Sequence, residues 1–161
     1  MTVQAEHPLE AKVRDVMEAM ARSLRVYQQI ELQLKVLLPH MVGPSREMDD
    51  SFAGWTTLLH SKTTLGSLVK RLNASVQSSD PEGFSHYLSE LVRHRNELIH
   101  HFCELPFGWI RTTQECDAAL THLNQRIQFA RAFHQSLTGL LAQFLIVLGD
   151  SILEDGGNNV P

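Results

Sequence analysis

The stretch that decides the fold is DPEGFSHYLSELVRHRNELIHHF, which runs from Asp80 to Phe102. Its first two residues predict a helix start, because an Asp side chain can accept from the first free backbone N–H groups and a proline at the next position loses no hydrogen bond. Apolar residues then return every three or four positions, which predicts an amphipathic helix that ends before Pro106. The stripe expected to face the core contains Phe84, Leu88, Leu91, Leu98 and Phe102.

Three other segments show the same spacing, and no segment alternates with the two-residue period of a strand. These segments are 9–38, 63–76 and 112–148. We expect Pro39 to end the first helix, and Thr112 with Glu115 to form a capping box at the start of the last. The sequence therefore predicts an all-α fold, a four-helix up-and-down bundle.

Each of these three helices has an apolar stripe of its own. In the first helix the stripe is expected to contain Val13, Met17, Met20, Leu24, Tyr27, Leu34 and Leu38. In the second helix the inward residues are Leu65, Leu68, Val69 and Leu72, and the residues in or near water are Lys62, Lys70 and Arg71. In the last helix the stripe includes Leu123, Ile127, Ala130, Leu137 and Leu141. His134 lies on this last stripe, where a core histidine with satisfied hydrogen bonds is expected.

Composition narrows the class of protein further. The 161 residues, 43% of them hydrophobic, predict a single helical domain over 1–161 with flexible tails at about 1–8 and 154–161. The net charge of -4 gives no global positive field, so any phosphate binding must depend on a local patch. Cys103 and Cys116, expected as buried thiols, suit the reducing cytoplasm, and the apolar run 137–148 is shorter than the ~20 residues that cross a bilayer. A cytoplasmic protein without a membrane partner is expected.

Two charged residues interrupt the apolar stripes. Arg95 stands where the third helix should present an aliphatic side chain, and Glu31 interrupts the first helix in the same way. Buried charges are tolerated mainly when they are paired, so we predict a contact between Glu31 and Arg95 across the core. The alternative is an Arg95 side chain that extends outward along the edge of the bundle.

His100 follows Arg95 by five residues, which on an ideal α-helix is about 140° further round, so the two are not expected to share a face. Arg93, Asn96 and His100 do share one, and they form a basic strip beside the apolar stripe. An imidazole can transfer protons at neutral pH and a guanidinium can stabilise a pentacovalent phosphate. Together these groups have the chemistry of a metal-independent ribonuclease.

The segment 91–102, LVRHRNELIHHF, resembles the signature of the HEPN (higher eukaryotes and prokaryotes nucleotide-binding) superfamily. In that family an Arg, often followed by Asn, precedes a His after four to six residues, and here four residues separate Arg95 from His100. The segment 63–68, TTLGSL, is similar to the Thr-Leu-Gly helix start of bacterial members. Phe102 departs from the pattern, because members that pair with a nucleotidyltransferase antitoxin carry Tyr there.

The resemblance implies a homodimer whose paired motifs form a composite ribonuclease site, in a toxin, a phage-defence effector or an RNA-processing protein. Arg95 would orient or neutralise the scissile phosphate, Asn96 would hold the phosphate or the histidine, and His100 would act on the 2′-hydroxyl or the leaving oxygen. Cleavage would leave a 2′,3′-cyclic phosphate and need no metal or cofactor. The supporting residues are Glu31, Arg93 and His101. RNA is the expected substrate, and an antitoxin or regulatory protein is a possible partner.

Several alternatives stay open at this point. His94, Glu97 and His101 lie near one helical face, but their spacing matches no strong zinc signature. The aromatic residues that could stack on bases are Trp55, Phe107 and Trp109. Two of them, Phe107 and Trp109, lie in the loop next to Pro106, where we expect them instead to cap the bundle. The alternative function is a non-catalytic HEPN-like bundle that acts as a dimerisation, nucleotide-binding or regulatory protein-interaction module.

Overall fold

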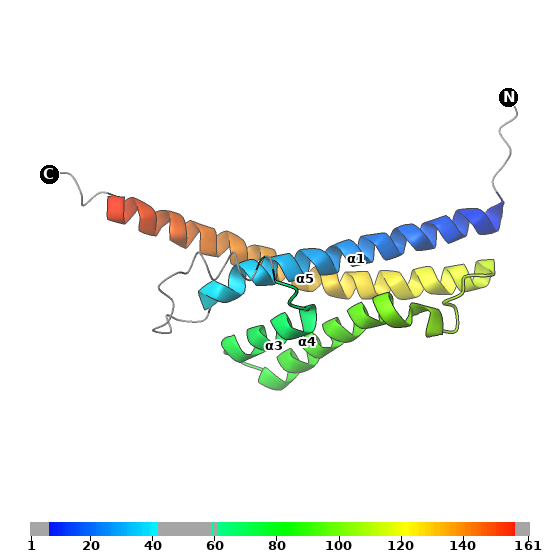
Figure 1. Cartoon of the computed structure of the whole chain (residues 1–161), viewed down its shortest axis with the longest axis horizontal. Helices are drawn as coiled ribbons and strands as arrows, with labels where there is room; N and C mark the ends of the chain where they lie inside the picture. Colours follow the sequence, from blue (N-terminus) through cyan, green and yellow to red (C-terminus); the bar gives the residue numbers. More distant parts are fainter. Residues whose placement is uncertain (1–6, 42–58, 60, 157–161) are drawn as a thin grey trace, which may run out of the picture.

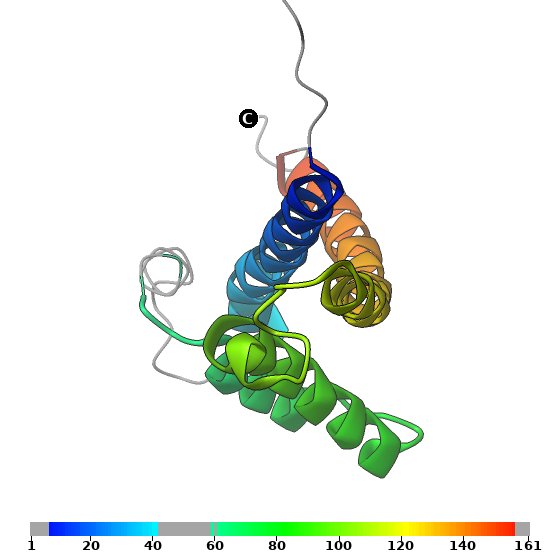
Figure 2. The same ribbon diagram turned by 90° about the vertical axis from the view of Figure 1, so that its right-hand side faces the viewer.

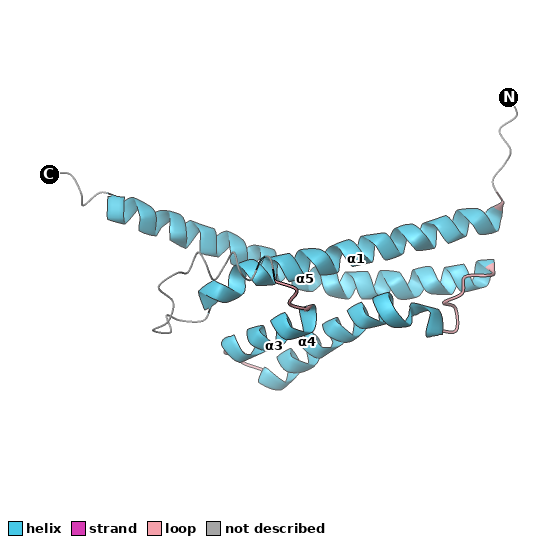
Figure 3. Cartoon of the chain, in the orientation of Figure 1, coloured by secondary structure: helices cyan, strands magenta, loops and turns pink. Residues whose placement is uncertain are grey.

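The fold is all-α. A computed structural model describes residues 7–41, 59 and 61–156. Four helices have bounds within these ranges: α1 over Pro8–Met41, α3 over Leu65–Ser75, α4 over Pro81–Asn96 and α5 over Thr113–Gly156. No strand occurs among the described residues (Figures 1 and 3). The predicted fold class is confirmed.

The two long helices, α1 and α5, run side by side in the same direction (Figure 1). Lys12 pairs with Asp117 near the first turns of the two helices. About six turns of α1 further on, the Gln33 amide donates to the Thr138 hydroxyl at 2.8 Å. Both pairs join residues 105 positions apart, as parallel helices in one register require. In an up-and-down bundle the first and last of four helices are antiparallel, so the predicted topology is wrong. Short connections impose antiparallel neighbours, and the long connection between Met41 and Leu65 does not.

The core consists of two clusters of buried side chains. The larger cluster joins all four helices, and α3 and α4 lie together on one side of the α1–α5 pair (Figure 2). It is built around Tyr27, Ile30, Leu34, Leu38, Leu65, Leu68, Val69, Leu72, Leu88, Leu91, Ile127, Phe133 and Leu137. The smaller cluster, nearer the first turns of α1 and α5, contains Val16, Ala19, Phe102, Cys116, Ala119 and Leu123. All four inward residues predicted for α3 are buried.

The apolar stripe predicted for α1 is wrong in its first half. Met17 and Leu24 are 53% and 38% exposed, whereas the small residues Ala19 and Ser23 are buried. Ala19 and Ala119 belong to the same buried cluster between the two parallel helices, and small side chains there permit a close approach of the helices. The prediction that the large apolar side chains face the core therefore chose the wrong face of this part of α1.

The helix ends match the predicted signals in part. The Asp80 carboxylate accepts from the Gly83 N–H at 2.9 Å, and Thr112 and Glu115 form the expected reciprocal capping box. Pro39 does not end α1, which continues to Met41 with the proline ring buried; its missing N–H removes only the hydrogen bond to the backbone carbonyl of Lys35.

The segments predicted as tails are partly helical. Pro8 begins α1, and α5 extends beyond the predicted 148 to Gly156, so 154–156 belong to a helix. The remaining tail residues, 1–6 and 157–161, and the predicted loop from 42 to 54 lie outside the described residues. Among the described helices, none carries an apolar stretch long enough to cross a membrane. Cys116 is buried as expected, but Cys103 is exposed on a short 3-10 turn.

α4 does not end in an α-helical turn. A π-helical turn over Glu97–His101 follows it directly, and a 3-10 turn over Phe102–Glu104 comes next. The chain then reverses through 105–110, where Gly108 lies so close to the Phe102 carbonyl that a Cβ would come within 2.0 Å of its oxygen. Only glycine fits this approach, which fixes where the extended α4 stops.

Candidate active site

Arg95, Asn96 and His100 line one open pocket of about 320 Å³. The sequence-based expectation that Arg95 and His100 do not share a face is therefore wrong. It assumed α-helical geometry, but the π turn that begins at Glu97 closes its hydrogen bonds from residue i to i+5. This wider turn brings a residue five positions on towards the face of the first, and π turns are frequent at functional sites.

The opposite wall of this pocket is the start of α3, with Thr64, Leu65 and Gly66. The Thr64 side chain makes no capping hydrogen bond to the first turn, so backbone N–H groups there keep their donor capacity. A Cβ at Gly66 would meet Val92 at 3.7 Å, an ordinary contact. The TTLGSL segment and the RNELIH segment, singled out separately in the sequence, thus form the two sides of one pocket.

The predicted contact between Arg95 and Glu31 is present. A guanidinium nitrogen of Arg95 lies 3.7 Å from a carboxylate oxygen of Glu31, and another donates to the Asn96 amide oxygen at 3.3 Å. The Arg95 and Glu31 side chains are 23% and 24% exposed, so the pair lies at the edge of the core and not within it. Glu31 therefore holds the Arg95 side chain while leaving it in contact with the pocket.

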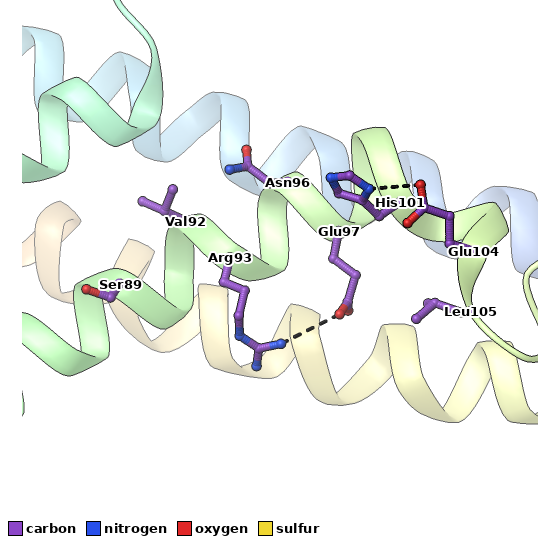
Figure 4. Close-up of a pocket in the computed structure, with 8 residues that line it drawn as sticks. All are labelled: Ser89, Val92, Arg93, Asn96, Glu97, His101, Glu104 and Leu105. Atoms are coloured by element: carbon purple, nitrogen blue, oxygen red, sulfur yellow. Dashed lines mark hydrogen bonds and ion pairs between the residues drawn. The ribbon is translucent and has the colours of Figure 1, made fainter.

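A neighbouring pocket of about 620 Å³ shares Val92, Asn96 and His101 with the first (Figure 4). Arg93 lines only this second pocket, so it does not share a strip with His100. Its guanidinium donates to both oxygens of Glu90, and these bonds lower the pKa of Glu90 to about 2. Arg93 is thus occupied by a local ion pair. His101 lines both pockets, and its Nδ1 lies 3.1 Å from Glu104 Oε1.

The inward side of the same stretch carries a polar cluster that sequence reasoning missed. Glu97 Oε1 lies 2.7 Å from His122 Nε2 and 3.6 Å from Arg126 Nε, both on α5. His122 and Arg126 are one helical turn apart, but neither belongs to the apolar stripe that the sequence predicts for the last helix. These contacts join the first residue of the π turn to α5.

His94, next to Arg95, is 3% exposed and packs edge-on against Phe129. Burial lowers its pKa to about 4, and the charges of Arg126 and Arg93 add to this effect. The ring is therefore neutral at pH 7. Since His94 points inward, Glu97 contacts α5 and His101 pairs with Glu104, the three residues do not converge on a metal; the described residues hold no group of three potential ligands.

Other predicted residues are placed as follows. Phe102, at the position where some HEPN members carry Tyr, is buried against Phe107 and Cys116. Trp109 does not cap the bundle: it is 61% exposed, and Arg111 lies over its ring. Trp55 lies outside the described residues. His134 is only half-buried, because the neighbouring Phe133 occupies the core position.

No family model matches the chain, and no curated protein or solved structure matches it either. The chemistry of the first pocket is therefore the main guide to function. It combines a guanidinium, a carboxamide, an exposed imidazole and the first turn of a helix, all within about 320 Å³. These are hydrogen-bond donors suited to an anionic group beside a residue that can carry a proton.

Proposed function

We propose that the chain is a metal-independent endoribonuclease of HEPN type. The observation that carries this proposal is the convergence of Arg95, Asn96 and His100 on one pocket, because a π turn replaces the expected α turn between them. The proposal includes a homodimer in which two such pockets form a composite site. The role would be that of a toxin, a phage-defence effector or an RNA-processing protein, with an antitoxin or regulatory protein as a partner.

In this mechanism the scissile phosphate lies between Arg95 and the first turn of α3. The guanidinium and the free N–H groups stabilise the negative charge that builds up on the phosphorus oxygens. The 2′-hydroxyl attacks phosphorus, its proton leaves to a base, and the bond to the 5′-oxygen breaks as that oxygen gains a proton. His100 carries one of these two protons. The products are a 2′,3′-cyclic phosphate and a 5′-hydroxyl, and no redox step or metal is involved.

Two neighbouring residues support Arg95 and His100 in this scheme. Glu31 orients the Arg95 guanidinium from α1, and the Asn96 amide is held by Arg95 so that its nitrogen is free to face the phosphate. The two cysteines are unpaired, which fits the reducing cytoplasm that we propose as the location.

The test is cleavage of a mixed cellular RNA pool in EDTA by wild-type protein and by His100→Ala. The variant should lose about 10²- to 10⁴-fold in rate, the contribution of a general acid or base. Its thermal midpoint should not change, because the His100 side chain is exposed. His86→Ala is the matched control, since His86 is also exposed and lies on the same helix away from the pocket.

End-group analysis separates the outcomes. Wild-type and His86→Ala fragments with 2′,3′-cyclic ends, and none from His100→Ala, support the proposal. Equal cleavage by all three proteins overturns the mechanism. Complete inactivity of the wild-type protein on every RNA tested would favour the non-catalytic alternative.

A further inference from the structure

A second surface of the molecule concentrates positive charge. A groove of about 410 Å³ lies between α1 and α5, on the seam formed by their parallel packing. The polar residues that line it are Arg22, Arg25, Gln29, Arg131, His134 and Gln135. Among the described residues, no carboxylate lines this groove. In a chain with a net charge of -4, this groove is the kind of local patch that phosphate binding requires.

The charges in this groove are poorly compensated. Arg22 pairs with Glu18 one turn earlier, at 3.6 Å and with both side chains more than half exposed. Such an exposed pair is weak and leaves much of the field of Arg22 in place. Arg25 and Arg131 have no carboxylate within ion-pair distance among the described residues. Within the described part of the chain, the groove therefore presents two guanidinium groups without a carboxylate partner and one weakly paired guanidinium group.

The groove faces away from the Arg95–His100 pocket. Gln29 is two positions from Glu31, which contacts α4, and two positions correspond to about 200° on a helix. On α5 the same holds for Arg131, which lies between Phe129 and Phe133, both in contact with Tyr87 of α4. A ligand in this groove does not reach the reacting atoms of the first pocket.

The lining residues indicate the class of ligand. Guanidinium and amide groups are the usual donors to phosphate oxygens. Among the described residues no Phe, Tyr or Trp lines the groove, and the imidazole of His134 is the one aromatic ring there, so the groove offers guanidinium groups for phosphates and little stacking surface for bases. A groove with three guanidinium groups and one ring favours the repeated phosphates of a polynucleotide backbone over a single free nucleotide.

We propose that the α1–α5 groove binds the sugar-phosphate backbone of RNA. It strengthens RNA binding and takes no part in the cleavage step. The inference rests on the proposed function in that the same RNA would occupy the catalytic pocket with another part of its length. The inference predicts that the groove increases the binding affinity for long RNA but not for a dinucleotide substrate.

The experiment measures binding of a labelled, mixed-sequence 30-nucleotide RNA by fluorescence anisotropy at several KCl concentrations. All proteins carry His100→Ala, so that the RNA stays intact. Arg25→Gln with Arg131→Gln should raise the Kd at least tenfold and reduce the salt slope by about 1.4, that is about 0.7 for each lost phosphate contact. The matched control, Lys70→Gln with Arg71→Gln, removes two exposed charges from α3 and should change the Kd less than threefold.

Two results would overturn the inference: equal effects of the two double variants, or no RNA binding by the parent protein. Circular dichroism checks that the exposed substitutions leave the fold intact. Failure of the two proposals can be told apart. If the groove variants weaken binding but wild-type protein never cleaves RNA, the nuclease proposal fails and the groove stands. If RNA is cleaved but the groove variants behave like their control, the groove proposal fails alone.

Discussion

The two faces of the stretch from His94 to His101 make opposite use of polar side chains. On the inner face, His94 is buried and neutral, and the Glu97 carboxylate contacts His122 and Arg126 of α5. On the outer face, Arg95 and His100 border an open pocket, and Arg95 makes only a partly exposed ion pair with Glu31.

The difference separates groups that hold the fold from groups available to a ligand. His94 is the buried member of the inner face, where a charge cannot be solvated by water. Glu97 is 18% exposed, but its carboxylate has three cationic or imidazole partners, Arg93, His122 and Arg126, so removing its charge affects several contacts at once.

On the outer face Arg95 and Glu31 make one partly exposed ion pair at 3.7 Å, so substitution there is expected to cost less stability. The comparison predicts large stability effects inside and small ones outside.

The largest effect should be the pH dependence that His94 gives to stability. Its pKa is lowered to about 4 in the folded protein, against about 6.5 in the unfolded chain. The unfolded chain therefore binds the proton first, and stability present above pH 6.5 is lost as the pH falls towards 4, by about 3 kcal/mol in all. Urea unfolding measured from pH 7.5 to 4 should show this slope.

The control for this prediction is a matched pair of glutamine variants. His94→Gln should reduce the slope of the free energy of unfolding against pH by about 1.4 kcal/mol per pH unit. His86→Gln, at an exposed position of the same helix, should leave this slope unchanged. Parallel curves for wild type and His94→Gln would mean that the fold does not lower the pKa of His94.

The next largest effect should come from Glu97→Gln. The substitution keeps the shape but removes the charge that faces His122 and Arg126, and we expect a loss of about 2 kcal/mol in the free energy of unfolding at pH 7. Glu104→Gln, which alters a 71% exposed carboxylate in the same stretch, should cost less than about 0.5 kcal/mol. Denaturant unfolding compares the two, and equal costs would contradict the distinction between the faces.

The smallest effect should come from the outer pair. Arg95→Ala should cost no more than about 1 kcal/mol, because Glu31 is left at a position that water reaches. A double-mutant cycle with Glu31→Ala should give a coupling energy of about 0.5 kcal/mol. A loss of several kcal/mol would show that the pair behaves as a buried one. RNA cleavage, by contrast, should fall sharply in Arg95→Ala if the proposed function is right.

Much of the fold was predictable because its signals are local. Asp80 with Pro81, and Thr112 with Glu115, mark helix starts through hydrogen bonds that span three residues. The contact between Glu31 and Arg95 was also predictable, although the residues lie on different helices, because two opposite charges interrupted apolar stripes. Those stripes were less informative where small residues, such as Ala19 and Ala119, are buried between the helices.

The sequence by itself determined the fold class, the four helices with their starts, and the residue types that gather in the pocket. Each of these depends on hydrogen bonds and spacing within a few residues. Only the tertiary structure decided the parallel pairing of α1 with α5, because a long connection leaves the direction of the next helix free. It also decided the π turn, whose first residue contacts α5, and with it the meeting of Arg95 and His100 in one pocket.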